Sequence, residues 1–137
     1  MRIDCHIHTH IKTGYGDYNN FDSDALLCDL KKAGMDGAAI YSLSPFENPE
    51  MSGDERMAYA LNVCKGKENL FPFHWINPLD EDALSQVDTA IEKGFVAFKM
   101  IPSNYKVGCQ KSLDVIEKIA KRGKSIMFHS GDRKSVV

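Results

Sequence analysis

The sequence lacks the features that mark membrane, secreted or nucleic-acid-binding proteins. Its longest apolar runs are far shorter than a bilayer requires, and no basic segment followed by an apolar stretch opens the chain. The net charge is only −2, with both signs mixed along the 137 residues, so there is no electrostatic footprint for nucleic acid. We expect a cytoplasmic protein that binds neither membranes nor nucleic acids.

Paired cysteines and glycine-rich phosphate loops are also missing. The four cysteines are scattered and form no C-x-x-C pair, which is typical of reduced thiols in the cytosol. The segment GYGDYNN at 14–20 lacks the G-x-G-x-x-G form of a dinucleotide-binding loop. What remains is the composition of an ordinary globular protein, 43% apolar and 26% charged. We treat 1–137 as one domain.

One unit recurs along the chain: an amphipathic helix, a glycine and a short apolar strand. The glycines that end the helices lie at 34, 66, 94 and 123, so the period is close to thirty. Ser52 and Glu55 form a capping box for the second helix, and Asp80 is the expected cap of the third. After the opening strand, further strands are predicted at 35–42, 70–76, 95–101 and 125–129. This alternation indicates parallel βαβ units.

Two α/β architectures fit this period. One is a five-stranded doubly wound sheet, which is nearly complete at this length. The other is a (β/α)8 TIM barrel, which needs roughly 250 residues, so that this chain would be a partial barrel of about four and a half βα units. Periodicity alone does not separate them.

Several candidate ligands and bases stand where strands end. In the opening MRIDCHIHTH, alternation puts Asp4, His6 and His8 on one face of a strand, and two imidazoles on one face are half of a metal site. His74, Lys99 and His129 come late in the third, fourth and fifth strands, and His10 follows the first strand in a loop. Because the carboxyl ends of parallel strands form the active face, these side chains should converge.

The pattern IDCHIH resembles the first-strand signature of the amidohydrolase superfamily. Three later segments resemble its amidohydrolase-related branch, which includes the aminocarboxymuconate-semialdehyde decarboxylase-like enzymes. They are ALLCDLKKAGMDGAAI, LFPFHWINPLDEDALSQVDTAIEKGFVAFKMIP and VIEKIAKRGKSIMFHSG. The resemblance covers nearly the whole chain and implies a distorted TIM barrel with a divalent metal, zinc above all, at the carboxyl end of the strands.

The resemblance implies roles for individual residues. His6, His8 and His129 match the metal ligands of strands one and five, and Lys99 matches a lysine common in this branch. We predict that Lys99 and His74 bind substrate. The implied reaction is metal-activated attack of water on an amide, lactone or similar carbonyl of a small molecule, with decarboxylation as the variation known in this branch.

The chain also departs from the family pattern. The family supplies a further histidine from strand six and an aspartate from strand eight, and neither has a counterpart here; Asp132 follows strand five but does not match that position. No catalytic base is therefore identified, and we expect this truncated chain to be inactive alone. The open edges of a half-barrel favour association, so we expect a homo-oligomer.

Two other classes of protein remain open. A PHP-type metal-dependent phosphoesterase also opens with D-x-H-x-H-T, although it usually carries a histidine after strand two, where this chain reads YSLSP. A non-catalytic doubly wound binding domain, or an inactive remnant of the enzyme family, would explain a short chain.

Overall fold

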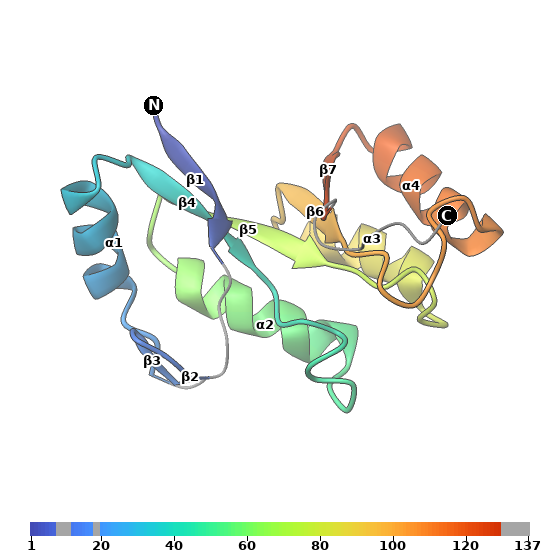
Figure 1. Ribbon diagram of the computed structural model, residues 1–137, viewed down its shortest axis with the longest axis horizontal. Coiled ribbons are helices and arrows are strands. Elements are labelled where there is room, and N and C mark those ends of the chain that lie inside the picture. The colour runs from blue at the N-terminus through green and yellow to red at the C-terminus, as the bar shows by residue number, and fades with distance from the viewer. Residues whose placement is uncertain (8–11, 18–19, 130–137) are drawn as a thin grey trace, which may run out of the picture.

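The computed structural model describes residues 1–7, 12–17 and 20–129 of the chain (Figure 1). In order, the elements are β1 (Ile3–Ile7), β2 (Lys12–Thr13), β3 (Gly16–Asp17), α1 (Ser23–Lys32), β4 (Gly37–Tyr41), α2 (Gly53–Cys64), β5 (Leu70–Trp75), α3 (Ala83–Glu92), β6 (Ala97–Met100), α4 (Gln110–Lys121) and β7 (Ser125–Phe128). The predicted strands and helices are therefore present, and the short hairpin of β2 and β3 is an addition.

The main sheet has five parallel strands in the order β1-β4-β5-β6-β7. Each new strand is added at the same edge of the growing sheet, whereas in a doubly wound sheet the edge at which strands are added changes part way. Right-handed crossovers then place every helix on the same face of the sheet, and α2 contacts α3 as α3 contacts α4. The fold is a half-barrel, which confirms the prediction of a partial TIM barrel.

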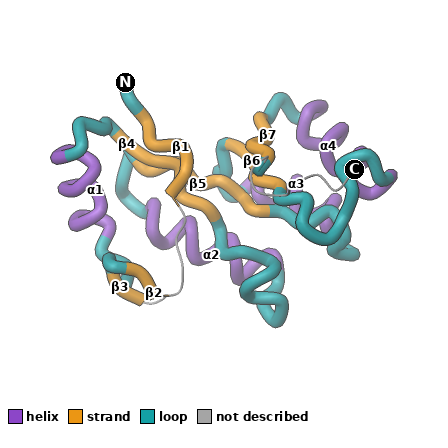
Figure 2. Tube along the Cα trace, viewed as in Figure 1, coloured by secondary structure: helices purple, strands orange, loops and turns teal. Residues whose placement is uncertain are grey.

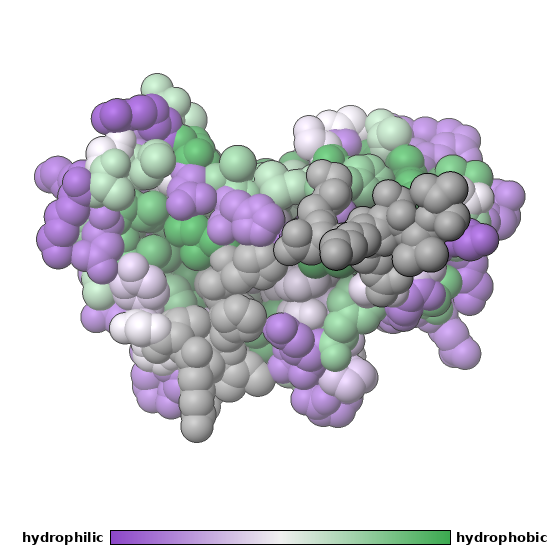
Figure 3. Space-filling model, viewed as in Figure 1, coloured by the Kyte–Doolittle hydropathy of each residue, from purple (hydrophilic) through white to green (hydrophobic). Residues whose placement is uncertain are grey.

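The core lies between the helices and the sheet. It is one cluster of buried side chains, to which the strands contribute Ile40 and Phe98 and the helices Met57, Val87 and Ile119. The strands wind across the molecule from β1 to β7 with the helices alongside (Figure 2). In the view of Figure 3, hydrophilic side chains gather over α1 and α4 at the two ends of the molecule. Because α1 and α4 also contribute buried apolar side chains, both helices are amphipathic, as the sequence pattern predicted.

Helix boundaries follow local chemistry. The Ser52 hydroxyl accepts from the Glu55 N–H, and the Glu55 carboxylate accepts from the Ser52 N–H, so the predicted capping box is confirmed. The four glycines predicted to end the helices all have positive φ, for instance +74° at Gly34, a conformation that costs other residues energy.

The prediction that Asp80 caps the third helix is wrong. Helix α3 begins at Ala83, with Asp82 in the N-cap position. The Asp80 carboxylate instead accepts from Arg56 and from Gln86, two partners that lie on different helices. A distant, buried guanidinium outcompetes the local N–H groups because a charged partner gives the stronger hydrogen bond.

Strand β1 departs from regular pairing in the segment that carries His6. Asp4 pairs with Ala38 and Ile7 pairs with Ile40, so one extra residue lies on β1. Within this irregular segment the Asp4 carboxylate accepts from the His6 N–H at 2.9 Å. The strict alternation expected for this strand therefore does not hold between Asp4 and Ile7.

In the part of the chain that the structure describes, no helix is long and apolar enough to cross a membrane.

Gly37, at the start of β4, leaves no room for a side chain. A Cβ there would lie 2.3 Å from the backbone oxygen of Asn69, whereas a Cβ on Gly108 meets nothing within 4 Å. We predict that Gly37→Ala lowers the free energy of unfolding by about 1–3 kcal/mol, because strands β4 and β5 must move apart. Urea unfolding followed by circular dichroism measures this. Gly108→Ala is the matched control and should unfold like the wild type; equal midpoints for both variants would contradict the prediction.

Candidate metal site and its surroundings

His6 and His129 meet although they come from opposite edges of the sheet. His6 lies in β1 and His129 directly follows β7, where its N–H donates to the Met100 carbonyl. Their ring centres are 6.2 Å apart. In a flat sheet the first and fifth strands would be roughly 19 Å apart. The curvature of the half-barrel therefore brings the two imidazoles together.

Lys99 and Tyr41 lie beside this pair of rings. The Lys99 ammonium is 4.2 Å from the centre of the Tyr41 ring and 4.8 Å from the centre of the Trp75 ring. The Lys99 side chain is fully buried, and burial lowers the pKa of its amine to about 8. The Tyr41 ring is also 6.1 Å from the His6 ring. Lys99, one of the predicted substrate-binding residues, thus belongs to the same site as the histidines.

The Tyr41 hydroxyl ties three strands together. It donates to the Cys5 carbonyl of β1 at 2.5 Å and lies 2.7 Å from the Met127 sulfur of β7. Burial is the main reason that the pKa of Tyr41 rises to about 12, so the hydroxyl keeps its proton. The phenol therefore helps to hold β1 and β7 close enough for the two imidazoles to meet.

The surroundings of His6 favour its neutral form. Its pKa is lowered first by partial burial and then by the positive charges of Lys99 and His129, while Asp4 acts in the opposite direction. A neutral imidazole is the form that binds a metal ion. The electrostatics of the site are thus compatible with the predicted ligand role.

The distance between His6 and His129 can be compared with that of two imidazoles on one metal ion. Two imidazoles on one tetrahedral zinc, each with a nitrogen about 2.0 Å from the ion, have ring centres roughly 5 Å apart. The observed 6.2 Å is about 1 Å wider, a difference that small side-chain rotations cover. Among the residues that the structure describes, no group of three or more His, Cys, Asp or Glu side chains is placed to hold a metal. His8, the third predicted ligand, lies outside those residues.

His74 lies on the other face of the sheet from Lys99. Its ring is fully buried and packs against Phe95 and Phe98. Both nitrogens have protein partners: Nδ1 is 3.0 Å from the Ser42 hydroxyl and Nε2 is 3.0 Å from Gln86 Oε1. Substrate binding by His74, as predicted, would require the ring to give up one of these hydrogen bonds.

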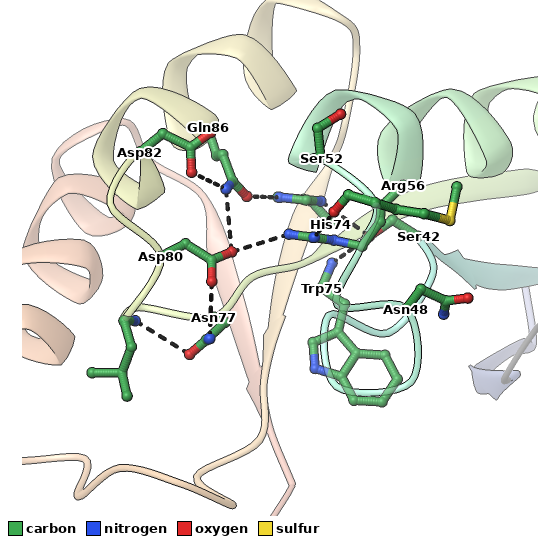
Figure 4. A network of polar contacts seen from close by, with 12 residues as sticks. Ser42, Asn48, Ser52, Arg56, His74, Trp75, Asn77, Asp80, Asp82 and Gln86 are labelled. Atoms are coloured by element: carbon green, nitrogen blue, oxygen red, sulfur yellow. Dashed lines mark hydrogen bonds and ion pairs between the residues drawn. The ribbon is translucent and has the colours of Figure 1, made fainter.

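A buried polar network continues beyond His74 (Figure 4). The Gln86 amide nitrogen donates to Asp82 at 2.6 Å and to Asp80 at 3.3 Å. On the other side of His74, the Ser42 hydroxyl accepts a hydrogen bond from the main-chain N–H of Trp75 at 2.8 Å. Neither Ser42 nor Gln86 stands out in the sequence, because their partners are distant along the chain. The sequence offered one signal: Ser42 at the end of a strand and Gln86 in a helix are polar residues at positions where the pattern expects apolar ones.

Arg56 joins this network to helix α2. It is buried, and its guanidinium donates to the Met51 carbonyl at 2.6 Å and to Asp80 at 3.1 Å. Gly53, in the first turn of the same helix, lies so close to Gln86 that a Cβ would be 2.6 Å from the amide carbon. The loops that follow β4 and β5 are thus fixed to each other at the carboxyl end of the sheet.

Comparison with known proteins supports the fold. Among the solved structures that match is a probable 2-pyrone-4,6-dicarboxylic acid hydrolase from Acinetobacter baumannii, crystallised with citric acid bound. The TM-score is 0.63 at 11% identity, over 94% of this chain and 49% of the hydrolase. This chain therefore spans about half the length of that protein, and at this identity the likeness establishes the fold alone. No protein-family model and no curated protein sequence matches.

His74 should make stability depend on pH. Burial lowers its pKa from 6.5 to about 4, assisted by the charge of Arg56. Between pH 4 and pH 6.5 the unfolded chain binds more protons at His74 than the folded one. The contribution of the neutral ring to stability is therefore fully present above about pH 6.5. It should fall toward pH 4 by at most about 1.4 kcal/mol per unit. Urea unfolding of the wild type and of His74→Gln between about pH 7 and pH 5 measures this. The variant should lose stability less steeply, and equal slopes would contradict the assignment.

Proposed function

We propose that the protein is a metal-dependent hydrolase of the amidohydrolase type, which acts on the carbonyl of a small molecule. The observation that supports this most strongly is the meeting of His6 and His129 from opposite edges of the sheet. His8 is separated from His6 by one residue in the sequence, and it is the proposed third ligand. Zinc is the ion that imidazole-rich sites of this kind commonly hold.

A divalent ion at these imidazoles would supply a polarised carbonyl or a water molecule with a pKa near 7. The chain's own residues would bind and orient the substrate. The Lys99 ammonium offers a positive charge beside the site, and the faces of Tyr41 and Trp75 hold that ammonium in place. A carboxylate or a polarised oxygen on the substrate carries the charge that complements this ammonium.

The similarity in fold gives a direction for the substrate search. The A. baumannii protein is named for hydrolysis of a pyrone dicarboxylate, which is a cyclic ester with two carboxylates. A lactone that carries carboxylates would suit both an imidazole-bound metal and the Lys99 ammonium. We therefore propose carboxylated lactones as the first compounds to test.

Metal content tests the proposed ligands. We predict that the full chain, loaded with zinc and desalted, retains the metal, and that the His6→Ala/His129→Ala double variant loses most of it. Elemental analysis measures the ratio of metal to protein. His74→Gln is the matched control, because it removes a histidine from the opposite face of the sheet and should leave zinc content unchanged. Equal zinc in the wild type and the double variant would disprove the ligand assignment.

Hydrolysis is tested separately from metal binding. Zinc-loaded protein is incubated with 2-pyrone-4,6-dicarboxylate and simpler lactones, and the loss of ring absorbance is followed. Turnover that requires zinc and disappears in the double variant would support the proposed reaction. Tight zinc binding without turnover of any lactone would support the metal site alone, as expected of a chain in which no catalytic base is identified.

A further inference from the structure

The hydrogen bonds of the buried network around His74 can be assigned donors and acceptors in one consistent way. Carboxylates of Asp80 and Asp82 only accept, so the Gln86 side chain must present its amide nitrogen to them. Its oxygen then faces His74 Nε2 at 3.0 Å. An amide oxygen can only accept, so Nε2 carries the imidazole proton. The two acidic side chains of the α3 terminus thereby determine the tautomer of a ring in the sheet.

The same logic extends to Ser42. With its proton on Nε2, the neutral ring offers Nδ1 as an acceptor, so the Ser42 hydroxyl must donate to it at 3.0 Å. The lone pairs of the hydroxyl oxygen then remain for the Trp75 N–H, which donates at 2.8 Å. With a neutral ring, this arrangement gives each hydrogen bond from Asp82 to the Trp75 main chain one donor and one acceptor.

The Ser42 hydroxyl replaces a main-chain group at the end of the sheet. The Ser42 N–H donates to the Phe73 carbonyl at 2.8 Å, as in a regular parallel ladder. In such a ladder the Trp75 N–H would donate to the Ser42 carbonyl. Here it donates to the Ser42 side chain instead. On the β4 side, the main chain of Trp75 is therefore held by a serine hydroxyl, while on the β6 side it pairs with Lys99.

The indole of Trp75 lies on the opposite face, against Lys99. The ammonium is 4.8 Å from its ring centre, and Phe46 packs edge-on at 6.3 Å from the same ring. Tyr41, the second ring beside the ammonium, is anchored independently through Cys5 and Met127. Of the two rings that hold Lys99, only Trp75 depends on the buried network.

We propose that Ser42 is a positioning residue for Lys99, which it holds in place through Trp75. The chain of hydrogen bonds through His74 and Gln86 keeps the Ser42 hydroxyl turned toward the Trp75 N–H. This inference rests on the proposed function only for the role of Lys99 in substrate binding. The contact between the Lys99 ammonium and the Trp75 ring is a property of the fold. A merely structural Ser42 would affect stability and leave the contact between the indole and the ammonium unchanged.

The single tryptophan of the chain gives a direct measurement, because all indole fluorescence comes from Trp75. In chelator-treated, metal-free protein, Lys99→Met should shift the emission maximum, since it removes a charge from the ring face. In the Ser42→Ala background the same substitution should produce little or no further shift. An equal Lys99→Met shift in both backgrounds would overturn the proposal.

Two further variants make the result specific. Ser112→Ala is the matched control: Ser112 is fully buried in α4, and its hydroxyl has no partner among the residues that the structure describes. It should leave the Lys99→Met shift at its wild-type size. Gln86→Met breaks the network two steps from Ser42 and should reduce the shift, and it decides the question if Ser42→Ala does not fold. An undiminished shift in Gln86→Met would count against the proposal, whatever the zinc content of the protein.

Discussion

The structure depends on parallel pairing that always proceeds in one direction. Because the order β1-β4-β5-β6-β7 follows the chain without reversal, every helix packs on one face and the other face curves inward. That curvature brings residues of the two edge strands, β1 and β7, close together. His6 and His129 are 123 positions apart in the chain, yet their ring centres are 6.2 Å apart. A doubly wound sheet built from the same units would have kept its first and last strands separated.

The end of β5 links the two faces of the sheet. Successive side chains alternate, so His74 enters the helix-covered core while Trp75 faces Lys99. Ser42 contacts both residues, one through its proton and the other through its oxygen. The polar network around His74 packs α3 against the sheet, and Trp75 belongs to the surroundings of Lys99. Here a single hydroxyl belongs to both.

Much of this fold is predictable because its signals are local. The capping box at Ser52 and the glycines with positive φ mark helix ends within a few residues of the chain. The choice between the half-barrel and a doubly wound sheet is not local, since both have the same period and differ only in which edge receives the next strand. The role of Asp80 is likewise missed: an aspartate before a helix predicts a cap, and only the folded chain brings Arg56 to it. His6 and His129 are predictable as candidates, because both stand at strand ends, but their proximity requires the curvature.

The charge of Lys99 beside two imidazoles raises a question of electrostatic balance. An ammonium repels a metal cation, and its charge adds to the partial burial that lowers the pKa of His6 and favours the neutral ring. Two aromatic faces, each with negative charge at its centre, offset part of the cost of burying the ammonium. With a pKa of about 8, the amine retains its proton at neutral pH but gives it up more readily than an exposed lysine. Tyr41 is anchored to β1 and Trp75 to Ser42. These two fixed rings restrict the long, flexible side chain of Lys99, so its charge stays at one place beside the imidazoles.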